Sequence, residues 1–198
     1  MRGSVRRGFA AVGVVAALVV AVPGSGQAST GCGVAVCAEA NAVAAWTCTT
    51  TDNISPGYDL IECSGRATPS GRGYSQLSVP GSLTWSGTTE YGYSFDGGMT
   101  WNRYPGPSTS ASTCTWAGLG EDTCGGTGTA ATQGVGGPIP WGACINTYYG
   151  WDLEVSATVT ATATKSVPVL GPIDSGTTTE TAAAKLSQVP QSERCAFQ

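Results

Sequence analysis

The chain has 198 residues, with 13 acidic and nine basic side chains, eight cysteines and no histidine. The absence of histidine excludes a Ser-His-Asp triad and histidine-ligated metal sites. Three of the nine basic residues lie within the first seven positions, so the remainder carries 13 acidic against six basic residues, a net charge of −7. This balance argues against nucleic acids and anionic membranes as partners.

The first 28 residues have the three parts of a secretion signal. A basic start is followed by the apolar segment 9–22 and then by small residues at Gly26 and Ala28, where a signal peptidase would cleave. Fourteen apolar residues are too few to span a membrane. We therefore expect cleavage after Ala28, secretion to the extracellular space and no membrane insertion afterwards. Acylation at Cys32 is the alternative, but Ser29 replaces the usual leucine and an odd number of cysteines would remain.

Residues 29–198 suit a single disulfide-rich domain, and their pattern predicts an all-β fold. Two strands, 42–51 and 58–67, are separated by turn-forming residues and are expected to form a hairpin. Shorter strands are expected at 75–79, 82–86, 90–95 and 99–104, with Pro80-Gly81 and Asp96-Gly97-Gly98 as turns. This spacing is typical of an antiparallel sandwich or a barrel-like fold.

The clearest strand is expected at residues 151–164. Apolar residues such as Leu153 and Val155 alternate with polar ones such as Asp152 and Glu154 over the whole segment. Strict alternation predicts a half-buried antiparallel strand whose polar face is exposed to solvent. At about 3.3 Å per residue, this strand would be roughly 45 Å long.

Two other segments lack this alternation. Residues 105–141 are rich in Gly, Thr, Ser and Pro, and are expected to form a long loop. Residues 180–188 contain three consecutive alanines and follow Thr179, which predicts a short C-terminal helix with Thr179 as its N-cap. The threonines that precede this segment favour a strand instead.

One short motif points to a known structural element. Residues 94–101 have the spacing S-x-D-x-G-x-x-W, with its four defining positions at Ser94, Asp96, Gly98 and Trp101. This segment resembles the Asp-box, a hairpin motif that is repeated in sialidases and sortilin-type propellers and occurs singly in other secreted folds. The resemblance implies a structural turn that lies away from an active site. It covers eight residues and implies no family for the whole chain.

The spacing of the motif has a direct physical interpretation. Asp96 can accept hydrogen bonds from backbone N–H groups across the turn. Gly98 can adopt a positive φ angle, which side chains disfavour. Trp101 can fold back and cover the hairpin.

The cysteines are expected to form four disulfides in an oxidising compartment. Eight cysteines allow 105 connectivities, and we favour the pairs that close short loops. These pairs are Cys32–Cys37, Cys48–Cys63, Cys114–Cys124 and Cys144–Cys195. Because there is no C-x-x-C spacing and no histidine, we expect neither a metal site nor a cofactor.

Aromatic side chains are the best candidates for ligand contact. Tyr91, Tyr93 and Tyr104 surround the Asp-box-like hairpin, and Trp116 lies beside Cys114 in the expected loop. Exposed aromatic rings can stack on sugars and anchor interfaces, although aromatic residues on strands more often lie in the core.

Three functions are compatible with these features. The leading hypothesis is a secreted, non-catalytic module that binds an extracellular glycan, a cell-envelope component or a protein. The second is a small glycoside hydrolase that uses two carboxylates, for which Asp152 and Glu154 are candidates about 7 Å apart on one strand face. The third is a hydrolase inhibitor that presents the 105–141 loop.

Overall fold

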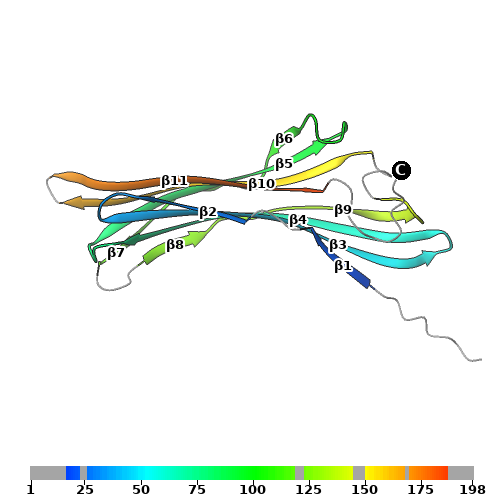
Figure 1. Cartoon of the computed structure of the whole chain (residues 1–198), viewed down its shortest axis with the longest axis horizontal. Coiled ribbons are helices and arrows are strands. Elements are labelled where there is room, and N and C mark those ends of the chain that lie inside the picture. Colours follow the sequence, from blue (N-terminus) through cyan, green and yellow to red (C-terminus); the bar gives the residue numbers. More distant parts are fainter. Residues whose placement is uncertain (1–16, 23–25, 119–122, 145–149, 168–169, 187–198) are drawn as a thin grey trace, which may run out of the picture.

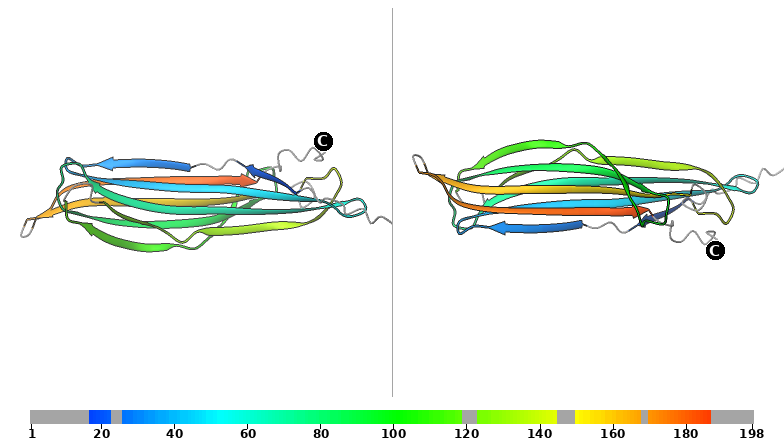
Figure 2. Two further views of the ribbon diagram at one scale, coloured as in Figure 1. Left: turned by 90° about the horizontal axis from the view of Figure 1, so that it is seen from below. Right: turned by 90° about the horizontal axis from the view of Figure 1, so that it is seen from above.

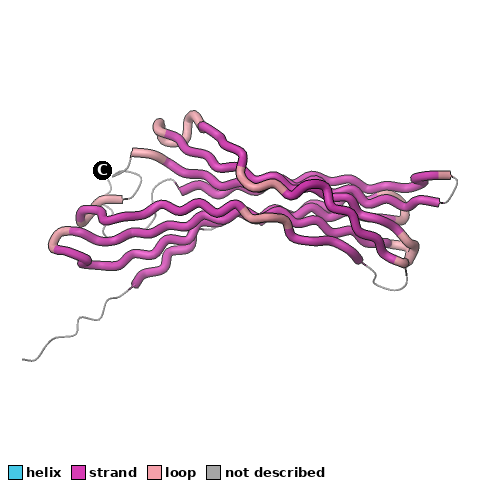
Figure 3. The backbone as a smooth tube through the Cα atoms, turned by 180° about the vertical axis from the view of Figure 1, so that it is seen from behind, coloured by secondary structure: helices cyan, strands magenta, loops and turns pink. Residues whose placement is uncertain are grey.

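The computed structural model describes residues 17–22, 26–118, 123–144, 150–167 and 170–186, which form an elongated sandwich of two antiparallel sheets (Figure 1). The described part contains strands and loops but no helix (Figure 3). The strands run along the long axis of the molecule in both layers (Figure 2). The predicted all-β sandwich is therefore confirmed.

Within the described residues, sheet A has six strands and sheet B has five. The strands of sheet A are β1 (Ala17–Val22), β2 (Gly26–Cys32), β3 (Val36–Ser55), β4 (Tyr58–Ser75), β8 (Thr123–Thr127) and β9 (Ala131–Pro140). The strands of sheet B are β5 (Gly81–Ser94), β6 (Asn102–Pro105), β7 (Thr109–Trp116), β10 (Asp152–Val167) and β11 (Gly171–Leu186).

Each sheet is built around two long paired strands, β3 and β4 in sheet A and β5 and β10 in sheet B. Strand β3 pairs with β4 along one edge, while β1 and β2 share its other edge. Strand β10 lies between β5 and β11, and the far edge of β5 is shared by β6 and β7. The hairpin formed by β5 and β6 extends above β10 in Figure 1.

The core lies between the two sheets and consists largely of small residues. On β3, every second residue from Val36 to Thr50 is buried, as expected for one face of a strand. Glycines of β4 make room for large rings. A Cβ atom on Gly65 would lie 2.6 Å from Trp46, and one on Gly71 would lie 2.6 Å from Trp85. Alanine at either position would therefore clash with a tryptophan.

Several of the expected strands are confirmed. The expected hairpin of 42–51 with 58–67 is the central part of the β3–β4 pair, and Thr51 is paired with Leu60. The strand expected at 151–164 corresponds to β10, which pairs with β5 without a register shift. The turn around Asp96-Gly97-Gly98 joins β5 to β6 in the same sheet.

The expected pair of short strands at 75–79 and 82–86, joined by a turn at Pro80-Gly81, is wrong. Residues 76–80 form no strand, and 82–86 and 90–95 are parts of the single strand β5. Because β4 belongs to sheet A and β5 to sheet B, the segment between them crosses from one layer to the other. A proline and a glycine favour a change of direction, but they do not specify whether the next strand pairs with the previous one.

The expected long loop at 105–141 is also wrong, since β7, β8 and β9 lie within it. Strand β7 pairs with β5, and both β8 and β9 pair with β4. These strands are short and contain glycine or small polar residues, so they lack the alternation that predicts strands. Their partners supply the hydrogen bonds that hold them extended.

The expected helix at 180–188 is wrong as well. Residues 171–186 form β11, which pairs with β10 over its full length. Ala182 and Ala184 of this strand face the core, where they are 2% and 4% exposed. The helix propensity of alanine is outweighed by this pairing and burial. Residues 187 and 188 lie outside the described part of the chain.

Three of the four expected disulfides are present. Cys32–Cys37 joins β2 to β3. Cys48–Cys63 joins β3 to β4. Cys114–Cys124 joins β7 to β8 and therefore links the two sheets. Cys195, the expected partner of Cys144, lies outside the described residues, so the fourth pair stays a prediction. Because Cys32 is bonded to Cys37, it is not available for acylation.

Candidate functional site: the β5–β6 hairpin

The turn between β5 and β6 is held by its own side chains. The Ser94 hydroxyl donates to Asp96 Oδ1 at 2.7 Å and accepts the Gly98 N–H at 2.9 Å. Asp96 also accepts the Thr100 N–H at 2.9 Å and the Thr100 hydroxyl. Gly97 and Gly98 have φ angles of 71° and 83°, which glycine adopts without steric cost. The contacts expected for Asp96 and Gly98 are therefore present.

These hydrogen bonds favour the ionised form of Asp96. The Ser94 hydroxyl makes the largest contribution, followed by Thr100, and together they lower the pKa of Asp96 to about 2. Asp96 is consequently charged throughout the physiological pH range, and it stabilises the turn as an acceptor.

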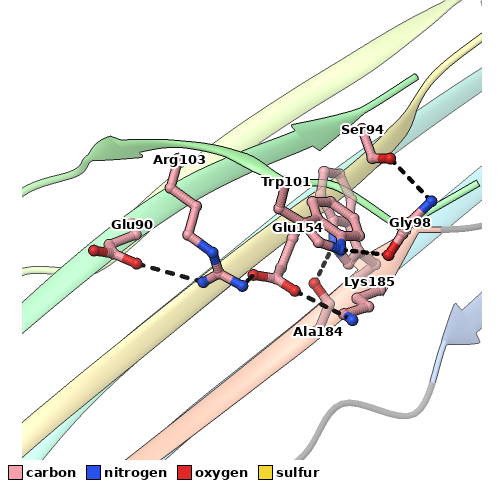
Figure 4. Close-up of polar contacts among 9 residues, drawn as sticks. Glu90, Ser94, Gly98, Trp101, Arg103, Glu154, Ala184 and Lys185 are labelled. Carbon is pink, nitrogen blue, oxygen red and sulfur yellow. Dashed lines mark hydrogen bonds and ion pairs between the residues drawn. The ribbon is translucent and has the colours of Figure 1, made fainter. Parts of the chain in front are cut away.

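Trp101 folds back over the hairpin and onto the outer face of sheet B (Figure 4). Its Nε1 donates to the Gly98 carbonyl at 3.1 Å. The ring fills the space above Gly92, where a Cβ atom would lie 3.1 Å from Trp101 and 3.2 Å from Glu154. Lys185 Nζ lies 5.1 Å from the centroid of the Trp101 ring, within the range of a cation–π contact.

Four strands contribute one residue each to a row across sheet B. In this row, Lys185 is paired with Glu154, Glu154 with Gly92, and Gly92 with Arg103. Glu154 is only 1% exposed. Its Oε1 lies 2.7 Å from Arg103 Nη2 in an ion pair without hydrogen-bond geometry, and its Oε2 lies 3.7 Å from Lys185 Nζ (Figure 4). Arg103 also pairs with Glu90 at 3.4 Å.

The predicted solvent exposure of Asp152 and Glu154 is therefore wrong. Asp152 is 6% exposed and Glu154 1% exposed, although both lie on the face of β10 that points away from the core. The hairpin covers Glu154, and this cover comes from a segment about 50 positions earlier in the sequence. Alternation places two residues on the same face but gives no information on what packs against that face.

Aromatic rings form a partly exposed cluster at the same hairpin. The rings of Tyr93 and Tyr104 are stacked, with centroids 5.7 Å apart, and their hydroxyls are joined by a 3.0 Å hydrogen bond. Phe95 lies edge-on to Tyr93 at 5.1 Å. Tyr104 is 52% exposed and Phe95 is 68% exposed. We call these three residues, Tyr93, Phe95 and Tyr104, the aromatic platform.

The hydroxyl of Tyr93 remains protonated at neutral pH. The hydrogen bond with Tyr104 is the main cause that raises the pKa of Tyr93 above its ordinary value. Tyr91, the third tyrosine expected near the hairpin, is half-buried and packs against the core, as does Tyr93, but it is not part of the stacked pair. The structure therefore brings Tyr93 and Tyr104 together and adds Phe95, which the sequence analysis did not select.

Trp116 does not lie on an exposed loop. It is 5% exposed, belongs to the core and donates its Nε1–H to the Val79 carbonyl at 2.9 Å. Its ring lies against Gly73 and Gly81, where a Cβ atom would lie 3.1 Å and 2.2 Å away. The proposed role of Trp116 as an exposed anchor is therefore incorrect.

A concave region lies elsewhere, on the outer side of sheet A. It is a groove of about 380 Å³ that contains Glu39, Asn41, Ser70 and Arg72. Arg72 pairs with Glu39 at 3.6 Å and lies 5.6 Å from the centroid of the Tyr74 ring. Since Glu39 is the one carboxylate that lines this groove, the groove does not contain the two facing acids of a glycoside hydrolase.

The ion pairs around Glu154 were not predicted from the sequence. Arg103 and Lys185 are 82 positions apart in the chain, and neither belongs to a recognisable motif. The local signal of close packing at this place was the glycine at position 92, near the end of β5.

Comparisons add no family to these observations. No family model and no curated protein matches the sequence. The described residues also contain no helix that is long and apolar enough to cross a membrane.

Proposed function

We propose that the protein is exported and acts outside the cell as a non-catalytic module that binds a polysaccharide. Export is supported by the basic and apolar N-terminal segment and by three disulfides, which persist in oxidising compartments. The rest of the proposal depends on the hairpin end of sheet B.

The aromatic platform is the observation that carries the binding function. Rings of Tyr93, Phe95 and Tyr104 lie side by side and partly exposed. Sugar rings have apolar faces that pack on aromatic rings, while the tyrosine hydroxyls can bond to sugar hydroxyls. The turn locked by Asp96 and the ion pairs below it hold the hairpin in one conformation, which reduces the entropy lost on binding.

The carboxylates favour binding over hydrolysis. Glu154 is buried and paired with two cations, so neither of its oxygens is open to a substrate. Asp96 accepts hydrogen bonds within its own turn and has a lowered pKa, whereas a general acid requires a raised one. Glu90 and Glu154 both lie at the hairpin, but they share Arg103 as their ion-pair partner. Among the described residues, Glu39 is the one carboxylate that lines the groove of sheet A.

The inhibitor hypothesis loses the feature on which it depended. That hypothesis relied on a long loop at 105–141, and strands β7, β8 and β9 occupy most of this segment. Residues 119–122, between Cys114 and Cys124, lie outside the described residues. A protein or an envelope component could contact the same exposed rings, and the binding experiment below separates these ligands from a polysaccharide.

The test is retention of purified, oxidised protein on insoluble polysaccharides such as cellulose, chitin, xylan and peptidoglycan. We expect retention on at least one of them. Tyr104→Ala and Phe95→Ala should each weaken this binding about fivefold, because an aromatic contact contributes about 1 kcal/mol.

Tyr58→Ala is the matched control, since Tyr58 is 42% exposed and lies in sheet A, away from the platform. It should bind like the wild type. Equal binding by the Tyr104→Ala variant would refute the platform, and the absence of retention on every polysaccharide would refute the proposed function.

A further inference from the structure

The outer edge of β3 has two partners, and both belong to the N-terminal segment. Strand β1 pairs with β3 from Ala17↔Thr51 to Val22↔Trp46. Strand β2 pairs with it from Gly26↔Val43 to Cys32↔Cys37. Cleavage after Ala28, on which this inference rests, would remove all of β1 and the first three residues of β2.

The cleaved chain would keep only a short partner on this edge. Residues 29–32 would remain paired with 37–40 and would stay attached through the Cys32–Cys37 disulfide. Residues 41–51 would lose their partner on this side while they stay paired with β4 on the other. At about 3.3 Å per residue, this leaves roughly 35 Å of backbone with unpaired N–H and C=O groups.

This edge has none of the features that prevent strands from associating. Residues 41–51 contain no charged residue, no proline and no glycine. Other edge strands differ, because β9 contains Pro138 and Pro140, and β11 contains Glu180 and Lys185. Long, uncharged strand edges without such residues pair readily with another strand.

The edge also pairs with an added strand in the uncleaved chain. In the uncleaved chain, the apolar segment Ala17–Val22 lies against it as an antiparallel strand in continuous register. The core side of β3 remains packed in that arrangement, with Trp46 fully buried and bonded to the Ala184 carbonyl at 3.1 Å.

We infer that the mature protein forms a two-fold dimer in which the β3 edges of two copies pair antiparallel. An antiparallel pair of identical strands is self-complementary, which is the requirement for a two-fold interface. The mature chain has a net charge of −7, but residues 41–51 contribute no charge and therefore no local repulsion. Exposed Val43 and Thr47 supply the β-branched cross-strand pairs that stabilise sheets.

Sedimentation of the secreted, oxidised chain tests this inference. The wild type should sediment as a dimer, and hydrogen exchange should show protected amides at 41–51. Val43→Lys and Thr47→Lys place a charge on exposed positions of this edge, so they should fold normally and raise the dimer dissociation constant more than about tenfold.

Thr160→Lys is the matched control, because Thr160 is an exposed threonine on the outer face of sheet B. It should remain a dimer. A monomeric wild type at every accessible concentration, or a dimer unaffected by both edge lysines, would overturn the inference.

Two independent measurements distinguish a failure of the dimer inference from a failure of the proposed polysaccharide binding. The intact mass of the secreted chain reports cleavage after Ala28, and retention on polysaccharide reports glycan binding. A cleaved monomer that binds the polysaccharide would overturn the dimer alone. An uncleaved chain would remove the premise of the dimer.

Discussion

The outward face of β10 has two halves with opposite environments. In the first half, Asp152, Glu154 and Ser156 are each at most 6% exposed. In the second half, the threonines from Thr158 to Thr164 are open or half-open to solvent. The strand and its alternation are the same in both halves. What differs around Glu154 is the β5–β6 hairpin, whose Trp101 ring packs over Gly92 beside Glu154 (Figure 4).

The open half is stabilised by hydroxyl pairs between strands. Threonines of β10 and β11 face one another in three consecutive rows, with hydroxyl distances of 2.9, 3.0 and 3.0 Å. Such cross-strand pairs suit a solvated face because each hydroxyl can also bond to water. The covered half instead requires ion pairs, because a buried carboxylate without a cation would be costly.

The difference between the two halves shows that the strand pattern alone does not decide whether a polar residue is buried. What packs on top of the residue decides it. Glu154 and Thr160 are equivalent in the strand pattern, but only Glu154 lies beneath a tryptophan and between two cations. Substitutions in the covered half of β10 should therefore lower the stability of the fold more than matched substitutions in the open half.

The largest effect is expected for Glu154→Ala. Loss of this carboxylate leaves Arg103 and Lys185 without their shared anion and opens a space beneath Trp101, so unfolding should become easier by about 1–3 kcal/mol. This loss of stability is smaller than that expected for a fully buried ion pair, because Arg103 and Lys185 are both half-exposed. Urea denaturation measures it.

Glu90→Ala is the control for this change, since Glu90 binds the same Arg103 but is half-exposed. It should cost less than about 0.5 kcal/mol. Equal losses for Glu154→Ala and Glu90→Ala would show that the cover above Glu154 does not matter.

A smaller effect is expected at the turn that positions the cover. The pKa of Asp96 is about 2 in the folded protein, below that of an unfolded aspartate. Its contribution to stability is therefore complete above about pH 4 and is lost as the pH falls towards 2. Melting temperatures of the wild type and of Asp96→Asn should differ more at neutral pH than at about pH 2. A difference that is constant with pH would refute the role of the charge.

The smallest effect is expected on the open half. Thr160→Ala removes one hydroxyl pair with Thr179, which should cost about 0.2–1 kcal/mol. A double-mutant cycle with Thr179→Ala isolates the interaction of the two hydroxyls. A loss as large as that of Glu154→Ala would contradict the comparison between the two halves.

Local pattern was sufficient for much of the fold. Strict alternation predicted β10, turn-forming residues predicted the β3–β4 hairpin, and short sequence separation predicted three disulfides. The spacing of the motif also predicted that Asp96 accepts a backbone N–H group across the turn and that Gly98 has a positive φ angle. The hydrogen bonds of Ser94 were not predicted.

Other elements depended on distant partners. The alanines of residues 182–184 favour a helix locally, but pairing with β10 makes them a strand. Glycine-rich β8 is extended because β4 supplies its hydrogen bonds. Neither segment has an alternation of its own. The threonines before Ala182 favour a strand locally, but the pairing with β10 is what extends the strand through the alanines.

The sequence by itself determined the all-β class, the oxidised chemistry and the locked turn around Asp96, since each depends on composition or on residues close together in the chain. Only the tertiary structure decided that Trp116 belongs to the core, that Tyr93, Phe95 and Tyr104 form one platform, and that Glu154 is buried between Arg103 and Lys185. These arrangements result from strand register and from the hairpin above sheet B, which bring together residues whose separation in the sequence carries no periodic signal.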